Sequence, residues 1–285
     1  MRAGKTSRTA ELIAAYRALD VSLGTEPILG DHFAGKMLRA AWRIPVESRV
    51  VRSLYFRFVM DLRPAMITFT GRSRIAEDAL AAKAKQGPVQ WVLLGAGLDT
   101  FAWRHPEHAA VPQFELDHPD TQAHKRAEIQ RLGLHAPEGH RFVPIDFERT
   151  SIPDALASAG FDRAIPAVFA WLGVTYYLTR DAITRTLMDV AAIAAPGSAM
   201  VCDYRLPDSY ISERDRPIQK RGDAAIAKWG EPHVSKLEPA EWAKLAADAG
   251  WRVDSDIGDD VLSERFARVG TRALSNYRIA TLGRG

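Results

Sequence analysis

The 285-residue chain is predicted to be an α/β protein of the Rossmann-like type, with a mostly parallel seven-stranded sheet, helices on both faces and an N-terminal helical cap. Three observations predict this. Residues 1–88 show helical periodicity and no strand pattern. From Val89 onward, short apolar runs bounded by Gly, Pro and Asp alternate with helical segments, which is typical of parallel strands joined by crossover helices. The first of these runs leads into a turn that contains two glycines.

Residues 1–88 are expected to form the cap. The spacing of apolar residues predicts helices around Ala10–Asp20, Val50–Leu62 and Arg72–Lys85. The second is expected to stop before Pro64 and the third at Gly87, because proline and glycine commonly mark helix ends.

Residues 89–285 are expected to form one domain, with an acceptor-binding insertion at about 205–236. That insertion shows no clear periodicity. The predicted strands are Val89–Leu94, Gln113–Asp117, Arg141–Asp146, Ala167–Leu172, Ala199–Asp203, Trp251–Asp256 and Tyr277–Leu282. The predicted helices are Thr100–Trp103, Asp120–Leu132, Ile152–Ala159, Asp181–Ala194, an amphipathic one around Trp242–Ala249, and Leu262–Leu274.

Composition excludes several classes of protein. The 38 Lys and Arg residues are nearly balanced by 35 Asp and Glu and are not clustered, which argues against a nucleic-acid partner. The longest uncharged run, residues 164–179, is too short and too interrupted for a membrane span, and the N-terminus does not resemble a secretory signal. A single cysteine, Cys202, cannot form an internal disulfide, so we expect a cytoplasmic location. The spacing of histidines predicts no metal site.

The segment Leu94-Gly95-Ala96-Gly97 joins a predicted strand to a predicted helix start. Glycines there allow close approach of a ligand to the backbone. Asp117 ends the next strand, 22 residues after Gly95, where a carboxylate accepts hydrogen bonds from the hydroxyls of an adenosyl ribose. Asp146 ends the third strand, and Phe147 follows it. A tight turn with a solvated acid would explain the glycines alone, but the spaced carboxylates favour a cofactor that contains adenosine.

The choice of cofactor depends on the third glycine position of the dinucleotide-binding motif. That position holds Thr100, which fits NAD poorly. S-adenosyl-L-methionine has no pyrophosphate, so two glycines suffice, and Asp146 with Phe147 would contact its adenine. The 88 helical residues before the first strand also argue against a dehydrogenase.

Several short elements resemble the leucine carboxyl methyltransferase family of class I S-adenosylmethionine-dependent enzymes, and the resemblance covers most of the chain. The elements are Ser7-Arg8-Thr9-Ala10, Tyr16-Arg17-Ala18, Asp31-His32-Phe33-Ala34, Gly71-Arg72-Ser73-Arg74, Leu94-Gly95-Ala96-Gly97-Leu98-Asp99-Thr100 with Trp103-Arg104, Glu115-Leu116-Asp117-His118-Pro119 with Lys125, and Gly230-Glu231-Pro232. Their common order and spacing give the resemblance its specificity.

The resemblance implies roles for particular residues. Arg72 would hold the methionine carboxylate of the cofactor, and Gly95 its amino group. Asp117 would hold the ribose. Arg17 would reach the cofactor from the cap. Where the family typically has a Glu-Gly pair after the fourth strand, this chain has Leu172-Gly173, so a carboxylate role cannot be transferred there.

The expected reaction is methyl transfer to a carboxyl or hydroxyl oxygen of a small molecule by in-line displacement. A carboxylate acceptor needs no base. For a hydroxyl, the candidate bases are His118, Tyr176, Tyr177 and Asp203, with His118 and Tyr176 as the predicted catalytic residues. The aromatic and imidazole side chains expected to line the acceptor site are Trp229, His233, Tyr204 and Tyr210. A protein that binds the cofactor without catalysis and a nicotinamide oxidoreductase are the alternatives, and the oligomeric state is open.

Overall fold

The computed structural model describes residues 7–23, 26–58, 61–147, 150–266 and 271–285. Its core is a seven-stranded sheet in the order β3-β2-β1-β4-β5-β7-β6, in which only β7 runs antiparallel to its neighbours. The strands are β1 (Gln90–Leu94), β2 (Gln113–Asp117), β3 (His140–Pro144), β4 (Ala167–Trp171), β5 (Ala199–Arg205), β6 (Arg252–Ile257) and β7 (Tyr277–Gly283). The predicted fold class and all seven strands are confirmed, to within two residues at each strand end.

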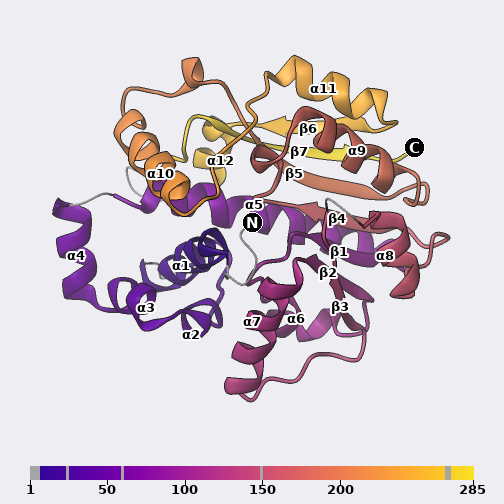
Figure 1. The fold of residues 1–285 in the computed structure, drawn as a ribbon, viewed down its shortest axis with the longest axis horizontal. Coiled ribbons are helices and arrows are strands. Elements are labelled where there is room, and N and C mark those ends of the chain that lie inside the picture. The colour runs from indigo at the N-terminus through magenta and orange to yellow at the C-terminus, as the bar shows by residue number, and fades with distance from the viewer. Residues whose placement is uncertain (1–6, 24–25, 59–60, 148–149, 267–270) are drawn as a thin grey trace.

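Side chains that alternate along each central strand build two apolar layers. In β1, Trp91 and Leu93 belong to the core on one face of the sheet, while Val92 and Leu94 belong to the core on the other. All five β1 residues are buried, because helices cover both faces of a parallel sheet. β1 therefore lies at the centre of the molecule, and its carboxyl end opens toward the cap (Figure 1).

The helices separate into two groups (Figure 1). α8 (Ile152–Ser158), α9 (Arg180–Ala191) and α11 (Pro239–Asp248) pack on one face of the sheet. α5 (Arg63–Ala84) and α12 (Asp259–Phe266) pack on the other, and outside α5 lie α1 (Arg8–Leu23), α2 (Ala34–Met37), α3 (Ala40–Glu47) and α4 (Arg49–Phe58). The remaining helical elements are α6 (Phe101–Arg104), η1 (Pro106–His108), α7 (Pro119–Arg131), η2 (Thr175–Tyr177), η3 (Asp208–Tyr210) and α10 (Arg216–Lys228).

The structure corrects four predictions about helices. α5 begins at Arg63 and not at Arg72, because Pro64 occupies its first turn, where a missing N–H costs nothing. Two short helices, α2 and α3, were not expected. The 205–236 segment contains α10, although Pro217 and Gly222 obscured its pattern. The helix predicted over 262–274 ends by Phe266, since residues 271–274 are not helical and 267–270 lie outside the described residues.

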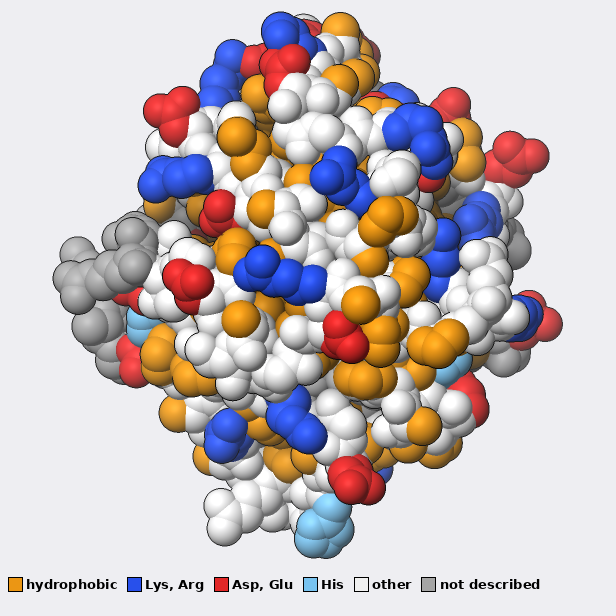
Figure 2. Space-filling view, turned by 90° about the vertical axis from the view of Figure 1, so that its right-hand side faces the viewer, with side chains coloured by type: hydrophobic (Ala, Val, Ile, Leu, Met, Phe, Trp, Pro, Cys, Tyr) orange, Lys and Arg blue, Asp and Glu red, His pale blue; other side chains and the backbone are white. Residues whose placement is uncertain are grey.

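Charged side chains of both signs are interspersed on the face shown in Figure 2. No described helix is both long and apolar enough to cross a membrane.

Candidate functional site

Two adjoining cavities lie between the sheet and the cap. The larger has a volume of about 490 Å³ and opens at the carboxyl ends of the central strands. It brings together every residue predicted for the cofactor and for catalysis, namely Arg17, Arg72, Gly95, Gly97, Asp117, His118, Asp146, Phe147 and Tyr176. A volume of this size suits a bound small molecule.

The glycine turn after β1 is shaped by backbone angles that favour glycine. Gly95 has φ +80°, and a Cβ there would lie 2.5 Å from a methyl group of Val174. Gly97 has φ +54°, and its N–H donates to the Asp117 carboxylate at 2.5 Å. The N–H of His118 donates to the other carboxylate oxygen at 2.6 Å. Each oxygen of Asp117 keeps lone pairs for a further donor, such as a ribose hydroxyl. Burial raises the pKa of Asp117, and these two N–H groups oppose that rise.

Arg72 reaches the cavity from the middle of α5, and it is 2% exposed. Its Nη1 donates to Asp203 at 2.5 Å and to the Tyr176 hydroxyl at 3.0 Å, and its guanidinium lies over the Phe69 ring. Nε is buried and has no hydrogen-bond partner among the described residues. A buried donor without a partner is costly. Arg72 therefore has donor capacity left for an anionic group such as a carboxylate.

Asp203 lies opposite Arg72 at the end of β5. It is 1% exposed and accepts hydrogen bonds from Arg72 and from the Gly173 N–H, the latter at 2.7 Å. A base must be able to release its present partner, and Asp203 neutralises a buried guanidinium. The expectation that Asp203 is a candidate base is therefore not supported by its geometry. Leu172, the departure from the family pattern, lines the cavity with its apolar side chain.

Arg17 joins α1 to the glycine turn. It is 3% exposed; its guanidinium donates to the Leu98 carbonyl and to Asp99 at 3.0 Å, and it lies 3.3 Å from Asp31. Its position in the cavity wall agrees with the prediction that it reaches the cofactor, but its visible contacts fasten the cap to the sheet.

The far end of the cavity is lined by Asp146 and Phe147, just after β3. Phe147 is 37% exposed, so its ring is available to a ligand. His118 is the N-cap of α7, where its Nδ1 accepts the Asp120 N–H at 3.2 Å. The capping hydrogen bond explains why a histidine stands here without assigning it a catalytic role.

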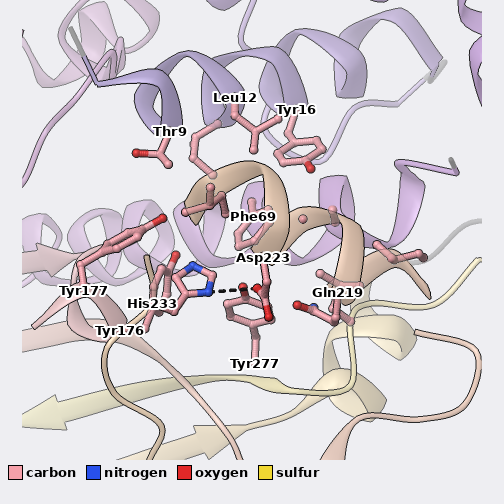
Figure 3. A pocket seen from close by; sticks show the side chains of 16 residues that line it. Thr9, Leu12, Tyr16, Phe69, Tyr176, Tyr177, Gln219, Asp223, His233 and Tyr277 are labelled. Atoms are coloured by element: carbon pink, nitrogen blue, oxygen red, sulfur yellow. Dashed lines mark hydrogen bonds and ion pairs between the residues drawn. The ribbon is translucent and has the colours of Figure 1, made fainter. Parts of the chain in front are cut away.

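The narrower cavity, about 60 Å³, lies between α1, α5, α10 and β7 (Figure 3). Its wall contains aromatic rings, namely those of Tyr16, Phe69, Tyr176, Tyr177 and Tyr277. It shares Thr9, Ile13, Tyr176 and Tyr177 with the larger cavity, so the two meet there. Burial raises the pKa of Tyr277 to about 12 and also raises the pKa values of Tyr176 and Tyr177 above the ordinary tyrosine value. These phenols are therefore neutral near pH 7, which does not favour Tyr176 or Tyr177 as a base.

Of the four side chains expected around an acceptor, only His233 lines this cavity. Trp229 packs edge-on against Trp42 in the cap. Tyr204 stacks on Trp242, with ring centroids 4.8 Å apart, on the other face of the sheet. Tyr210 is 45% exposed and donates to Glu238. The three predictions were wrong because a side chain's direction depends on the element that carries it, and α10 was not foreseen.

Sequence reasoning missed Asp223, on α10. Arg205 donates to both its carboxylate oxygens at 2.7 Å, and Nδ1 of His233 lies 3.2 Å from Oδ1. Arg205 Nη1 also contacts Nδ1 of His233. Although partial burial opposes ionisation, the hydrogen bonds from His233 and Arg205 hold the pKa of Asp223 well below its usual range. The spacing of Ile218 and Ile226, at i and i+8, was the available signal that one face of a helix lies here.

No group of three or more His, Cys, Asp or Glu side chains in the described part of the chain could hold a metal ion.

Comparison with known proteins gives a consistent result. The model of the family described as leucine carboxyl methyltransferase matches residues 10–191. A Bacillus subtilis protein, YktD, named as an S-adenosyl-L-methionine-dependent methyltransferase, is 27% identical over 93% of this chain and 93% of its own length. A protein of Mycolicibacterium smegmatis named in the same way is 32% identical over 91% of this chain and 88% of its own.

A solved structure shares the fold. A DUF574 family protein from Streptomyces avermitilis has a TM-score of 0.61 at 14% identity, with 99% of each chain covered. From the family model, which matches well over half of the chain, and from these relatives, the chain belongs to the leucine carboxyl methyltransferase family and is an S-adenosyl-L-methionine-dependent methyltransferase.

Proposed function

We propose that the enzyme transfers a methyl group to a carboxyl or hydroxyl oxygen of a small molecule. The observation that carries the proposal is the meeting of the two cavities at Tyr176 and Tyr177. The larger has the residues and the volume for the cofactor, and the narrower admits only a small group beside it. The narrower cavity lies beneath the cap, and its volume suits a small molecule.

The residues of the larger cavity fit S-adenosyl-L-methionine from end to end. Arg72 has a free Nε–H for the methionine carboxylate, and the glycine turn gives room for the amino group. Asp117 has acceptor capacity for the ribose, and Phe147 offers an exposed ring to the adenine near Asp146. Arg17 closes the cavity on the α1 side.

When bound, the cofactor supplies an electrophilic methyl group. Such a transfer needs the nucleophile to be aligned with the carbon–sulfur bond, so positioning and exclusion of water supply much of the rate. Tyr176 is placed to position both ligands, because it lines both cavities and accepts a hydrogen bond from Arg72.

We further propose that the enzyme acts in the cytoplasm on a small molecule, without nucleic-acid or membrane partners. The single cysteine and the mixed signs of the surface charges support this proposal.

The cofactor assignment is tested by Asp117→Ala. We expect S-adenosylhomocysteine to bind roughly 10- to 100-fold more weakly, because charge-assisted hydrogen bonds are lost. Isothermal titration calorimetry measures this, with Asp181→Ala, an exposed carboxylate in the first turn of α9, as the matched control. Equal affinity of Asp117→Ala and wild type would show that the assignment is wrong.

The type of acceptor is tested on the product. A methylated product found by mass spectrometry is treated with mild base, which hydrolyses an ester and leaves an ether intact. If the enzyme binds the cofactor but methylates nothing across a broad acceptor panel, the non-catalytic alternative replaces the proposal.

A further inference from the structure

Asp223 and His233 form a pair at the wall of the narrower cavity. α10 carries Asp223 and the loop before α11 carries His233, which places the pair under α1 (Figure 3). The residues on either side of His233, Pro232 and Val234, line the larger cavity. His233 therefore lies at the wall between the proposed cofactor and acceptor sites.

We propose that His233 is the general base of the transfer, that Asp223 is its positioning residue, and that the acceptor is a hydroxyl on a small aromatic ring. This inference rests on the proposed function and makes it more specific. Hydroxyl acceptors have to lose a proton during transfer, whereas a carboxylic acid has already lost it near pH 7.

Nδ1 of His233 faces two groups, the Asp223 carboxylate, which only accepts hydrogen bonds, and Nη1 of Arg205, which only donates them. The proposed base is the tautomer whose Nδ1–H donates to Asp223, which leaves the lone pair on Nε2. Figure 3 shows this second ring nitrogen turned away from Asp223, toward the α1 side of the cavity. Arg205 donates to the same carboxylate and keeps it charged and fixed in place.

Charge in the narrower cavity favours a neutral acceptor. None of its described lining residues is Lys or Arg, while Asp223 contributes a negative charge. Two buried cations lie behind this wall, and one of them, Arg205, is already paired with both oxygens of Asp223. The other, Arg72, contacts the lining residues Tyr176 and Phe69. Arg72 is paired with Asp203, and its remaining Nε–H is assigned to the cofactor carboxylate, so a carboxylate acceptor would be desolvated without a cation of its own.

The walls favour an aromatic ring. His233 has its ring centroid 4.9 Å from that of Tyr176 and 5.1 Å from that of Tyr177. Such spacings are typical of favourable aromatic contacts, and a planar acceptor extends the same cluster. The volume of about 60 Å³ holds several water-sized groups, which limits the entering group to about one ring.

The proposed step conserves atoms and charge. The acceptor oxygen uses a lone pair to form its bond to the methyl carbon, and the electrons of the carbon–sulfur bond stay on sulfur. The hydroxyl proton moves to Nε2 of His233 and then to water, so the products are a methyl ether, S-adenosylhomocysteine and one proton.

The acceptor class is tested with tritium-labelled S-adenosylmethionine and two matched sets of probes: phenol, catechol and para-cresol, then benzoate and para-toluate. We expect transfer to phenols that is stable to mild base. Transfer to the carboxylates alone, or to no phenol, would overturn the inference. Transfer to the carboxylates alone leaves the proposed function intact, whereas failure of the proposed function shows as S-adenosylhomocysteine binding without transfer to any acceptor of the broad panel.

The base is tested by His233→Gln, which should lower transfer to the phenol by about 100-fold or more, with S-adenosylhomocysteine affinity unchanged within about twofold. His135→Gln makes the same change at an exposed position outside both cavities and should leave both values unchanged. An unchanged rate in His233→Gln would contradict the assignment. If His233→Gln does not bind S-adenosylhomocysteine, Asp223→Asn is measured in its place, and we expect it to lose less of the transfer rate.

Two readouts distinguish positioning from a structural role. Nitrogen NMR should show His233 protonated at Nδ1, and the Nε2–H tautomer, in which Nδ1 accepts from Arg205, would overturn the proposal. The wild-type rate should fall as pH decreases and the imidazole is protonated, and this limb should disappear in His233→Gln. The titratable and charged groups that face His233 among the described residues are Asp223 of α10, Arg205 of β5, and Tyr176 and Tyr177 of η2, with Tyr277 of β7 beyond Arg205.

Discussion

The two cavities are assembled in different ways. The larger one takes its glycine turn and the carboxylates Asp117 and Asp146 from the ends of β1, β2 and β3, so the sheet itself fixes their positions. The narrower one takes its wall from segments between Thr9 and Tyr277, on four helices and a strand, which are joined by packing and by side-chain contacts such as Asp223–His233. A parallel sheet thus provides a cofactor site from local sequence, while the acceptor site depends on how the helices of the cap and insertion fit together.

The largest expected change in stability comes from breaking the buried Arg72–Asp203 pair, which lies beside Tyr176, where the two cavities meet. Asp203→Ala removes the partner of Arg72, whose guanidinium is 2% exposed and also holds Tyr176. We expect a loss of about 3 to 5 kcal/mol in the free energy of unfolding, because a buried charge is left uncompensated. Urea unfolding measures it.

Asp248→Ala is the control for that variant, since Asp248 pairs with Lys244 at the surface and its removal should cost less than about 0.5 kcal/mol. If the two variants unfold alike, the buried Arg72–Asp203 pair does not stabilise the fold as described.

A smaller effect is expected at the adenine end of the larger cavity. Phe147→Ala should weaken S-adenosylhomocysteine binding roughly two- to tenfold, in line with about 0.5 to 1.5 kcal/mol for an aromatic contact. The unfolding free energy should hardly change, because the ring is 37% exposed. Calorimetry with Tyr210→Ala, another exposed aromatic, serves as the reference. Equal affinity of wild type, Phe147→Ala and Tyr210→Ala for S-adenosylhomocysteine would show that Phe147 does not contribute to cofactor binding.

The smallest effect concerns the narrower cavity and depends on pH. The pKa of Asp223 is depressed in the folded state, so its stabilisation is present above the ordinary aspartate pKa of about 3.9 and is lost as pH falls below it. Wild type should therefore lose more stability than Asp223→Asn between pH 7 and pH 3. The difference should be about 1 kcal/mol or less, since the side chain is 40% exposed and screened. If the unfolding free energies of wild type and Asp223→Asn fall equally between pH 7 and pH 3, the coupling of Asp223 to Arg205 and His233 is contradicted.

Sequence alone predicted the cofactor side more completely than the acceptor side. Asp117 and Asp146 could be located because each ends a predicted strand, and the carboxyl ends of parallel strands meet at one edge of the sheet. Asp223 could not, because its partners Arg205 and His233 lie 18 and 10 residues away on other elements. Tyr204 shows the same limit, since the pleat of β5 turned it toward Trp242 and away from the acceptor side.

The antiparallel strand has a consequence for the order in which the sheet forms. β7 follows β6 in sequence but lies between β5 and β6 in the sheet. During synthesis, β6 therefore has no sheet partner until β7 has emerged, and the outer side of β5 stays unpaired over the same interval. This part of the sheet cannot assemble strand by strand from the N-terminus. It is completed only when β7 pairs with β5 and β6, and such long-range pairing is intrinsically slow. Until then the edges of β5 and β6 can pair with other chains.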